Sequence, residues 1–501
     1  PTLKKMDMEL DNLTPNERSK AMIEAMKWLK KKNYSIRING IDEISTTDFS
    51  NMFESCNTSF QIHYQLNPDE FVKKFNYALA IAAPVLAACT NSPILFAKRL
   101  WHETRIALFQ QAVDTRESTE HLAKADLRVP FGDEWLEEPL TQIFEKDLAK
   151  YKLFLKHKDP ENTKKVWEQG KIPQLVNLQT FNSSIFHWTR PCYGVLDGKP
   201  HLRIENRLLP AGPTIIDQVA NTAFWTGLMH GMPDTYADLP NRMAFEDAKI
   251  NTLKAARYGL TSQFRWIEGK KIKAAKLIEK ELLPIAEKGL AKAKVHHGDV
   301  EKYLQIIRDR VQSEQTGSQW MLDTWRELEM LETGEAKARS LTALIKKYQS
   351  DQKPVHQWPT KIDDLPKLDY SEVGHLMISD LYCVQEEDLI DQVIFSMSKK
   401  DHAHVPVTNK NGQLKGMLYA DKILNKVVIN GTSASRPTVV KEVMEKDPLT
   451  VSPGTSLTKA IKQMKQHHIK CLPVEHKDKL VGIITEYDIM QIAEKFLKNK
   501  N

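Results

Sequence analysis

The sequence predicts an α+β protein in two parts, and three observations support this fold class. Residues 59–66 and 201–207 each alternate polar with apolar side chains, the period-2 pattern of a strand with two different faces. Residues 242–348 have helical period almost throughout and are rich in Lys, Glu, Ala and Leu. A proline-containing stretch at 350–370 is followed by sequence that repeats itself. We therefore expect a first domain over 1–349 with a helical part from about 242, a linker at 350–370, and a duplicated unit after it.

The composition is that of a globular protein with room for roughly two to four domains. The chain has 501 residues, of which 41% are hydrophobic and 27% charged. Its net charge of +6 is spread over 71 Lys and Arg, so we expect small anionic ligands and no nucleic acid. No apolar run reaches membrane-spanning length and no signal peptide is visible, which predicts a cytoplasmic protein without membrane contact. The five cysteines are scattered and lack a C-x-x-C motif, which indicates reduced thiols.

The most informative strand is the one at 201–207. Its alternation places Arg203, Glu205 and Arg207 on one face, so that a carboxylate lies between two guanidiniums. The strand follows Trp188–Pro191 and precedes an apolar segment at 215–229, which favours a place inside a large domain. Buried charges must pair or hold a ligand. This row therefore suits a divalent cation together with an anion such as ATP phosphate or an amino-acid carboxylate; a structural salt-bridge network is the alternative.

Four stretches resemble motifs of the glutamate–cysteine ligase and carboxylate–amine ligase family, in the family's order. They are Phe60–Leu66 (a strand with H-x-x), Ala88–Pro93 (ACTNSP) followed by Arg105, Trp188–Pro191 with Ile204–Arg207 (WTRP and IENR), and Ala255–Leu260 (AARYGL). Each match alone is weak, and the four together, spread over about two hundred residues, make the signal.

This resemblance implies a glutamine-synthetase-like antiparallel sheet with many helices, and a reaction that joins a glutamate carboxylate to an amine with ATP and magnesium through an acyl phosphate. It implies substrates that are amino acids or amines. The family's opening strand bears G-x-E-x-E, whose glutamates hold the catalytic metals, and these 501 residues lack it. Either that start is missing from the sequence, which begins at Pro1, or the chain is a degenerate member.

The resemblance also suggests roles for individual residues. Glu205 is the predicted metal ligand, because Mg²⁺ prefers carboxylate oxygen. Arg190 and Arg207 are predicted to bind ATP phosphate or the glutamate carboxylate, since a planar bidentate donor suits both. Arg105 joins them as a weaker catalytic candidate. The predicted cofactor-binding residues of this domain are His63 and Arg257, for which a satisfied interior histidine and a surface ion pair are the ordinary alternatives.

The duplicated unit closely resembles a pair of α/β cystathionine-β-synthase-type (CBS) domains, at 371–430 and 438–498. Equivalent residues lie 67 positions apart: Met377 and Met444, Pro406 and Pro473, Asp421 and Asp488. The resemblance implies that such pairs associate face to face, so a homodimer is expected.

In nucleotide-binding CBS repeats a G-h-h-(S/T)-x-x-D segment supplies a hydroxyl for phosphate and a carboxylate for ribose. The second copy has Thr485 and Asp488 at these positions, and Thr450 is expected near the adenine. The first copy has Leu418 in place of the hydroxyl, so we expect at most one good site, for AMP or ATP. The alternative is that Thr485 only caps the following helix.

The leading hypothesis is therefore an ATP- and Mg²⁺-dependent carboxylate–amine ligase whose activity responds to adenine nucleotide bound by the CBS pair. The alternative hypothesis is a non-catalytic regulator that senses adenine nucleotide on a degenerate ligase scaffold.

Overall fold

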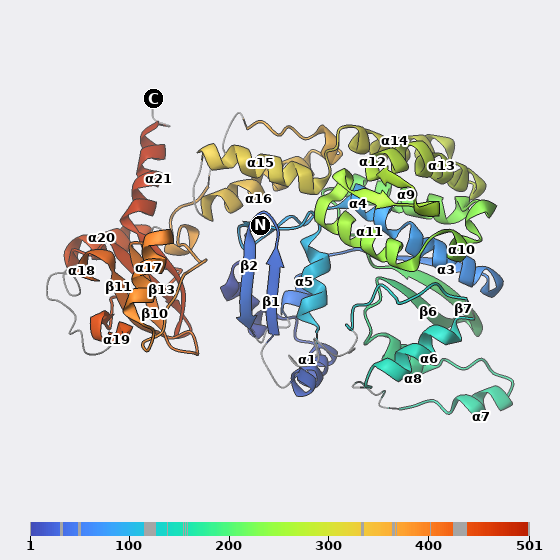
Figure 1. The fold of residues 1–501 in the computed structure, drawn as a ribbon, viewed down its shortest axis with the longest axis horizontal. Coiled ribbons are helices and arrows are strands. Elements are labelled where there is room, and N and C mark those ends of the chain that lie inside the picture. Colours follow the sequence, from blue (N-terminus) through green and yellow to red (C-terminus); the bar gives the residue numbers. More distant parts are fainter. Residues whose placement is uncertain are drawn as a thin grey trace. The chain divides into compact units, whose positions relative to one another are not determined.

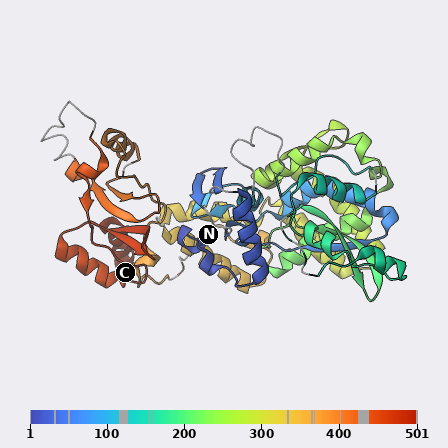
Figure 2. The ribbon, with the colours of Figure 1, turned by 90° about the horizontal axis from the view of Figure 1, so that it is seen from below.

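The computed structural model describes most of the chain. The described residues are 2–30, 34–48, 52–114, 127–137, 139–153, 155, 157, 159–331, 335–362, 366, 368–400, 402–423 and 438–498. They form two compact units (Figures 1 and 2): a larger unit of Met8–Glu327 with Leu344–Ile362, and a smaller unit of Pro1–Asp7, Leu328–Ala343 and Asp363–Asn501. Small antiparallel sheets and many helices confirm the predicted α+β class.

The larger unit is built around a three-stranded antiparallel sheet in the order β3-β7-β6. Its strands are β3 (Ile62–Leu66), β6 (Thr189–Leu196) and β7 (Lys199–Asn206). A two-residue turn joins β6 to β7, and both of its residues, Asp197 and Gly198, have positive φ. Asp-Gly is the sequence that such a tight hairpin turn favours, so local turn chemistry fixes the register of the two central strands.

The apolar face of this sheet packs on the main hydrophobic core. Ile204 is fully buried, and the Tyr64 ring lies edge-on to Trp225 with ring centroids 6.1 Å apart. Trp225 belongs to α9 (Ile215–Gly231), which packs closely on α13 (Leu283–Lys292). The helix contact depends on glycine, because a Cβ added to Gly289 would lie 1.9 Å from the Gly227 carbonyl oxygen. The opposite, polar face of the sheet is thereby left to the candidate site.

The larger unit contains further helices (Figure 1). They are α1 (Glu17–Lys30), α2 (Met52–Ser55), α3 (Phe71–Ala80), α4 (Ala82–Cys89), α5 (Thr104–Ala112), α6 (Thr141–Lys150), α7 (Thr163–Glu168), α8 (Val176–Asn182), α10 (Leu239–Arg242), α11 (Phe245–Tyr258), α12 (Ala274–Leu277) and α14 (His297–Gln312). Helices α15 (Gly317–Leu331) and α16 (Glu335–Ser350) each contribute residues to both units. Two-stranded sheets pair β1 (Tyr34–Asn39) with β2 (Glu43–Asp48), β4 (Ile94–Leu95) with β5 (Lys98–Arg99), and β8 (Gln263–Arg265) with β9 (Lys271–Lys273). The β8–β9 hairpin interrupts the region that the sequence predicted to be almost wholly helical.

Helices α3 and α4 meet at a bend of 46° around Ile81. Pro84 explains the bend, because its ring would clash with the Ala80 carbonyl in a continuous helix. Every residue of α4 is buried. Among the described residues no single helix is long and apolar enough to cross a membrane, and the bent pair Pro68–Ala80 and Ala82–Cys89 meets that test by length and composition.

The smaller unit repeats one helix-and-hairpin pattern. Helix α17 (Ile390–Lys400) recurs 67 residues later as α20 (Leu457–His467), and the hairpin β10 (His404–Thr408) and β11 (Leu414–Tyr419) recurs as β13 (Cys471–His476) and β14 (Lys479–Thr485). The other elements are α18 (Ala420–Ile423), α19 (Val440–Val443), β12 (Glu445–Lys446) and α21 (Glu486–Lys498).

The opening segment of each repeat completes the sheet of the other. Ile378 and Ile483 exchange two backbone hydrogen bonds of 2.8 and 3.0 Å. The equivalent exchange pairs β12, at the start of the second repeat, with β11 of the first. The two copies therefore form one interlocked core.

Candidate functional site

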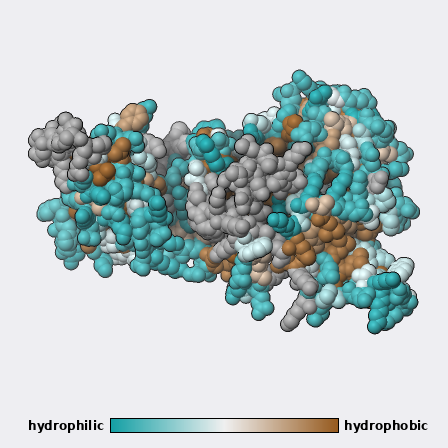
Figure 3. Space-filling model, turned by 60° about the horizontal axis from the view of Figure 1, so that its bottom comes forward, coloured by the Kyte–Doolittle hydropathy of each residue, from teal (hydrophilic) through white to brown (hydrophobic). Residues whose placement is uncertain are grey.

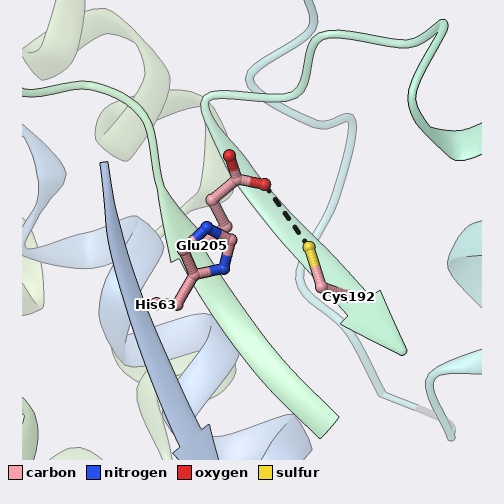
Figure 4. Close-up of side chains that lie close together, drawn as sticks. All are labelled: His63, Cys192 and Glu205. Atoms are coloured by element: carbon pink, nitrogen blue, oxygen red, sulfur yellow. Dashed lines mark hydrogen bonds between the residues drawn. The ribbon is translucent and has the colours of Figure 1, made fainter. Parts of the chain in front are cut away.

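Three of the predicted site residues lie in one row across the central sheet. His63 on β3 is directly opposite Glu205 on β7, and Glu205 is directly opposite Arg190 on β6. Residues opposite each other in antiparallel strands project from the same face. The row is therefore a consequence of strand register, and Figure 4 shows His63, Glu205 and Cys192 converging on that face.

Glu205 is the centre of this face and is fully buried. Its Oε2 accepts a hydrogen bond of 2.7 Å from Arg190 Nε, and Arg190 Nη2 lies 2.5 Å from the same oxygen. The Cys192 thiol lies 3.4 Å from Oε2. The other oxygen, Oε1, is 3.7 Å from Arg207 Nε and has no hydrogen-bond partner among the described residues. One carboxylate oxygen is thus hydrogen-bonded, and the other has only the longer ion pair with Arg207.

Cations outnumber the carboxylate on this face. Arg190, Arg203 and Arg207 surround Glu205, and buried atoms of two of them, Arg203 Nε and Arg207 Nη1, have no hydrogen-bond partner in the described part of the chain. Burial, followed by the neighbouring charge of Arg190, lowers the pKa of Arg207 to about 10. Unsatisfied buried donors beside an excess of positive charge suit an anion with several oxygens.

The pKa values of His63 and Cys192 are both shifted in the direction that favours the neutral side chain. Partial burial lowers the pKa of His63; Glu205 opposes this shift, and the three arginines add to it. Burial, together with Glu205, raises the pKa of the Cys192 thiol to about 11. At neutral pH the face therefore presents an uncharged imidazole and an uncharged thiol beside Glu205.

One atom each of His63, Cys192 and Glu205 lies within 4.8 Å of the other two, which is the spacing of a metal-ligand set. Mg²⁺ takes oxygen ligands, and it is often held by one or two carboxylates with water and phosphate oxygens. Glu205 fits this requirement through its unpartnered Oε1. His63 and Cys192 offer the softer nitrogen and sulfur, so these residues fit Mg²⁺ only with a phosphate ligand that completes the shell.

The face opens into a cavity of about 180 Å³, here called the polar cavity. It is lined by His63, Arg190, Cys192 and Arg203 from the sheet and by Phe144, Leu178, Gln179, Asn182, Ser183 and Tyr193. The hydrogen bond of 2.8 Å from Asn182 Nδ2 to the Pro191 carbonyl fixes α8 against the edge strand β6. The cavity is therefore bounded by α6, α8 and the polar face of the sheet.

A buried network supports the chain where β7 ends. Glu103 is fully buried and accepts hydrogen bonds from the Asn91 backbone (2.9 Å), the Ser92 hydroxyl (2.7 Å) and Arg105 Nε (3.1 Å). Arg105 in turn donates to the Leu208 carbonyl. The predicted catalytic candidate Arg105 is thus occupied by Glu103 and the backbone next to Arg207, which is the arrangement of a positioning residue, and a direct role stays a prediction.

Arg257 adjoins this network through the backbone, because its carbonyl accepts a hydrogen bond of 3.3 Å from the His102 backbone and the neighbouring Ala256 carbonyl accepts one of 2.8 Å from the Glu103 backbone. Arg257 is exposed on α11 and its guanidinium lies 4.5 Å from the centre of the Trp101 ring. This contact replaces the surface ion pair that was the ordinary alternative, and cofactor binding by Arg257 stays a prediction.

Sequence reasoning missed three side chains of this region. Cys192 reaches Glu205 only through the register of β6 on β7, and Glu103 is recognisable only from its partners. Glu54 in α2 lies within electrostatic range of Arg207, which partly offsets the rise that burial gives to the pKa of Glu54. None of the three belongs to a pattern with a chemical meaning in sequence.

In the smaller unit Thr485 and Asp488 bind each other. Asp488 Oδ2 accepts hydrogen bonds from the Thr485 backbone (2.8 Å) and hydroxyl (2.6 Å), and the Thr485 hydroxyl accepts from the Asp488 backbone at 3.3 Å. This reciprocal arrangement caps α21. Burial raises the pKa of Asp488. Thr450 is half-buried beside Val451, whose backbone donates to the Pro473 carbonyl at 3.0 Å. Nucleotide binding by the three residues stays a prediction.

Comparison with known families decides the identity of the larger part. The family described as Glutamate-cysteine ligase family 2 (GCS2) matches residues 4–345. The chain belongs to this family. CBS domains match residues 373–429 and 440–495, which confirms the predicted CBS pair. Both resemblances read from the sequence are thereby confirmed.

Individual relatives of this family member match shorter segments. A homoserine O-acetyltransferase of Methanohalobium evestigatum is 27% identical over 130 residues, which are 26% of this chain and about a quarter (25%) of that protein. The CBS domain-containing protein YhcV of Bacillus subtilis is 30% identical over 119 residues, which are 24% of this chain and 83% of that protein. A solved structure, a putative acetoin utilization protein (AcuB) from Vibrio cholerae, has 28% identity and a TM-score of 0.25, and the match covers 26% of this chain and 98% of that one.

Proposed function

We propose that this member of the glutamate–cysteine ligase family 2 joins the carboxylate of glutamate to an amine, using ATP and Mg²⁺ and passing through an acyl phosphate. The observation that carries the proposal is the unsatisfied polar face of the central sheet. Glu205 Oε1, Arg203 Nε and Arg207 Nη1 are buried without hydrogen-bond partners among the described residues. A buried acceptor beside two buried donors is the arrangement that a cation and an anion would complete together.

The residues of the face would act mainly by charge and position. Transfer of phosphate to a carboxylate brings several negative oxygens together, and fixed guanidiniums in a water-poor site stabilise that charge more than water does. Arg207 and Arg203 would bind the phosphate or carboxylate oxygens, and Arg190 would hold Glu205 in place. Glu205 Oε1 would hold Mg²⁺, which supplies further neutralisation of the phosphate charge when bound.

His63 would act as an uncharged ligand in this scheme. Its lowered pKa keeps the imidazole neutral at physiological pH, so that it contributes a nitrogen acceptor and adds no further positive charge. In this state it can accept a hydrogen bond from the cofactor or the incoming amine.

The CBS pair would adjust the ligase through adenine nucleotide, AMP or ATP, bound near Thr450, Thr485 and Asp488. Binding changes activity only if the nucleotide prefers one conformation of the chain over another. For nucleotide to bind at Asp488, ribose hydroxyls must replace or share its hydrogen bonds with Thr485. Association of two CBS pairs into a homodimer is part of the proposal, and light scattering of the full chain tests it.

The test is ADP release from Mg-ATP by the full-length protein, with glutamate and a panel of amines that includes cysteine. We expect ADP only when both substrates are present. Glu205→Gln should abolish it, whereas Glu168→Gln, on the exposed surface of α7, should leave it unchanged. ADP release with no dependence on an amine would contradict ligation.

A non-catalytic sensor of adenine nucleotide is the second candidate, and one observation favours it. Glu205 is the single carboxylate in the metal-ligand cluster found among the described residues, and one of its oxygens is already paired with Arg190. Silence across the amine panel, with ATP or AMP still raising the melting temperature, would establish this candidate instead.

A further inference from the structure

A second cavity adjoins the polar cavity. Its volume is about 470 Å³, and its lining comes from α3, α6, α8 and the sheet. Phe144, Leu178 and Tyr193 line both cavities, so the two share a wall. We call the second one the apolar pocket.

The apolar pocket differs chemically from its neighbour. Apart from Glu137 and Thr141, its lining side chains are Pro, Phe, Val, Leu and Tyr. The hydroxyl of Tyr193 donates to the Pro173 carbonyl at 2.8 Å, so this residue offers its ring and not its polar end. Hydrophobic surface gathers on the larger unit in Figure 3, in contrast to the mainly hydrophilic surface of the smaller unit in the same view. The pocket suits an apolar group, and its one carboxylate favours a neutral or cationic ligand over an anion.

Leu175, in one wall of the pocket, has an unfavourable backbone conformation. Leu175 has a φ of 53°, in the left-handed region that a leucine rarely adopts. The Glu161 carboxylate holds it there by accepting hydrogen bonds from the backbone of Gln174 (3.0 Å) and Leu175 (2.9 Å). Such local strain persists where the surroundings fix it, and it is concentrated at ligand sites. Leu175 lines the pocket at the start of α8, so the wall is preformed.

The size of the pocket restricts its occupant. A cavity of about 150 Å³ with an apolar lining holds benzene, and the apolar pocket has roughly three times that volume. The side chain of cysteine, with one methylene and a thiol, would leave most of it to water. A bulky aromatic or branched apolar group would occupy much more of it.

We propose that the apolar pocket receives the side chain of the amine substrate, and that this substrate is a primary amine or amino acid with a bulky apolar group. The inference rests on the proposed ligase function. The acyl group and phosphates occupy the polar cavity beside Arg190 and Arg203, and the amine nitrogen reaches them past the shared wall of Phe144, Leu178 and Tyr193. The apolar group then lies between α3, α6 and α8.

The adenine ring of ATP is the other aromatic group that could reach this pocket. Adenine carries ring nitrogens that need donors, and the lining side chains offer one free hydroxyl, that of Thr141. An apolar side chain needs no such partner, which favours the amine.

The experiment compares 2-phenylethylamine, methylamine and cysteine as acceptors with the full-length protein, Mg-ATP and glutamate. Each added buried methylene changes kcat/KM by about tenfold or more in an apolar pocket, so 2-phenylethylamine should exceed methylamine by at least that factor. Val72→Trp fills the pocket from α3 and should remove the preference. Leu148→Trp, on the exposed surface of α6, is the matched control and should keep it.

A binding measurement separates this inference from catalysis. In the absence of ATP and glutamate, 2-phenylethylamine should raise the melting temperature of the wild type and of Val72→Ala, and not of Val72→Trp. ADP release with cysteine or methylamine, without any advantage for 2-phenylethylamine, would leave the ligase standing and overturn the apolar acceptor. Competition of adenosine with 2-phenylethylamine would also overturn it, by assigning the pocket to adenine. ADP release with no amine at all would instead remove the ligase function on which the inference rests.

Discussion

The polar face of the central sheet and the Thr485–Asp488 pair were both predicted to bind adenine nucleotide, and they differ in how their polar groups are satisfied. On the sheet, buried atoms of Glu205, Arg203 and Arg207 lack hydrogen-bond partners in the described residues. In the smaller unit, Thr485 and Asp488 exchange three hydrogen bonds. The sheet therefore keeps hydrogen-bonding groups that a ligand could satisfy directly, whereas the Thr485–Asp488 pair must give up internal bonds to accept one. Affinity is reduced wherever binding has to break such bonds first.

The largest expected effect comes from Glu205→Ala. Removing one partner of a buried ion pair leaves uncompensated charge and costs about 3–5 kcal/mol, and here the guanidiniums of Arg190 and Arg207 would face each other without their carboxylate. Denaturant unfolding should show a loss of this size, and ADP release should disappear. An unchanged free energy of unfolding would mean that the face is open to water, and the contrast with the CBS site would fail. Glu168→Gln is the exposed control.

The second largest effect is expected at Glu103, which supports the chain next to the polar face of the sheet. Glu103→Gln keeps oxygen and shape but removes the charge that pairs with Arg105. Because Gln still offers an acceptor to Arg105, the expected loss is that of a charge-assisted hydrogen bond, about 1.5–3 kcal/mol, and the chain at Leu208 should become less fixed. We expect lower stability and a higher KM for ATP or glutamate, whereas nucleotide binding at the CBS pair should stay intact. Equal weakening of both sites would indicate general unfolding instead.

A smaller change is expected for Thr485→Ala, which removes the cap of α21. Loss of such a cap costs typically ~1 kcal/mol, and Thr485→Ser should restore it, because the hydroxyl accounts for two of the three hydrogen bonds. The melting temperature measures both variants.

A substitution of Asp488 tests the response of the CBS pair to nucleotide. Asp488→Ala should abolish the shift in melting temperature that AMP or ATP causes. A shift that survives this substitution would place the effector site elsewhere and would identify the Thr485–Asp488 pair as a cap alone.

The smallest effect is on the pH dependence of stability. The pKa of His63 on the sheet and of His404 in the smaller unit are both lowered from 6.5 by burial. A histidine whose folded pKa is lowered takes up its proton first in the unfolded chain, so stability should fall as the pH drops below 6.5. Around His63 three arginines add to the effect and Glu205 opposes it; near His404 the carboxylates of Asp421, Asp488 and Glu486 oppose it and Lys470 adds to it. Unfolding followed against pH should flatten in His63→Gln; an unchanged slope would contradict the lowered pKa.

Much of the sheet site could be predicted because strands carry a two-residue period. That period alone places Arg203, Glu205 and Arg207 together, and it places His63 on one face of its own strand. The pairing of His63 with Glu205 and of Glu205 with Arg190 needs the register, which the turn at Asp197 and Gly198 and the pairing of β3 determine in three dimensions. Only the resemblance to family motifs could group His63, Arg190 and Glu205 into one site from the sequence.

Other features could not be predicted because they depend on distant partners. The helices α3 and α4 bend where Pro84 meets Ala80, and the region predicted to be almost wholly helical contains the β8–β9 hairpin. Arg105 was recognised as important, but its partner Glu103 was not, because a lone glutamate carries no pattern. The apolar pocket combines side chains from α3, α6, α8 and β7, so no single stretch of sequence describes it.

The exchanged segments of the smaller unit have a consequence for how this part of the chain can be cut or copied. One repeat by itself would lack the segment that Ile378 or β12 supplies and would expose an unpaired strand edge, which invites pairing with another molecule. Two chains could satisfy those edges by trading the same segments, which is a domain swap. The pair, and not the single repeat, is therefore the piece that can be truncated, transplanted or inherited as a stable whole.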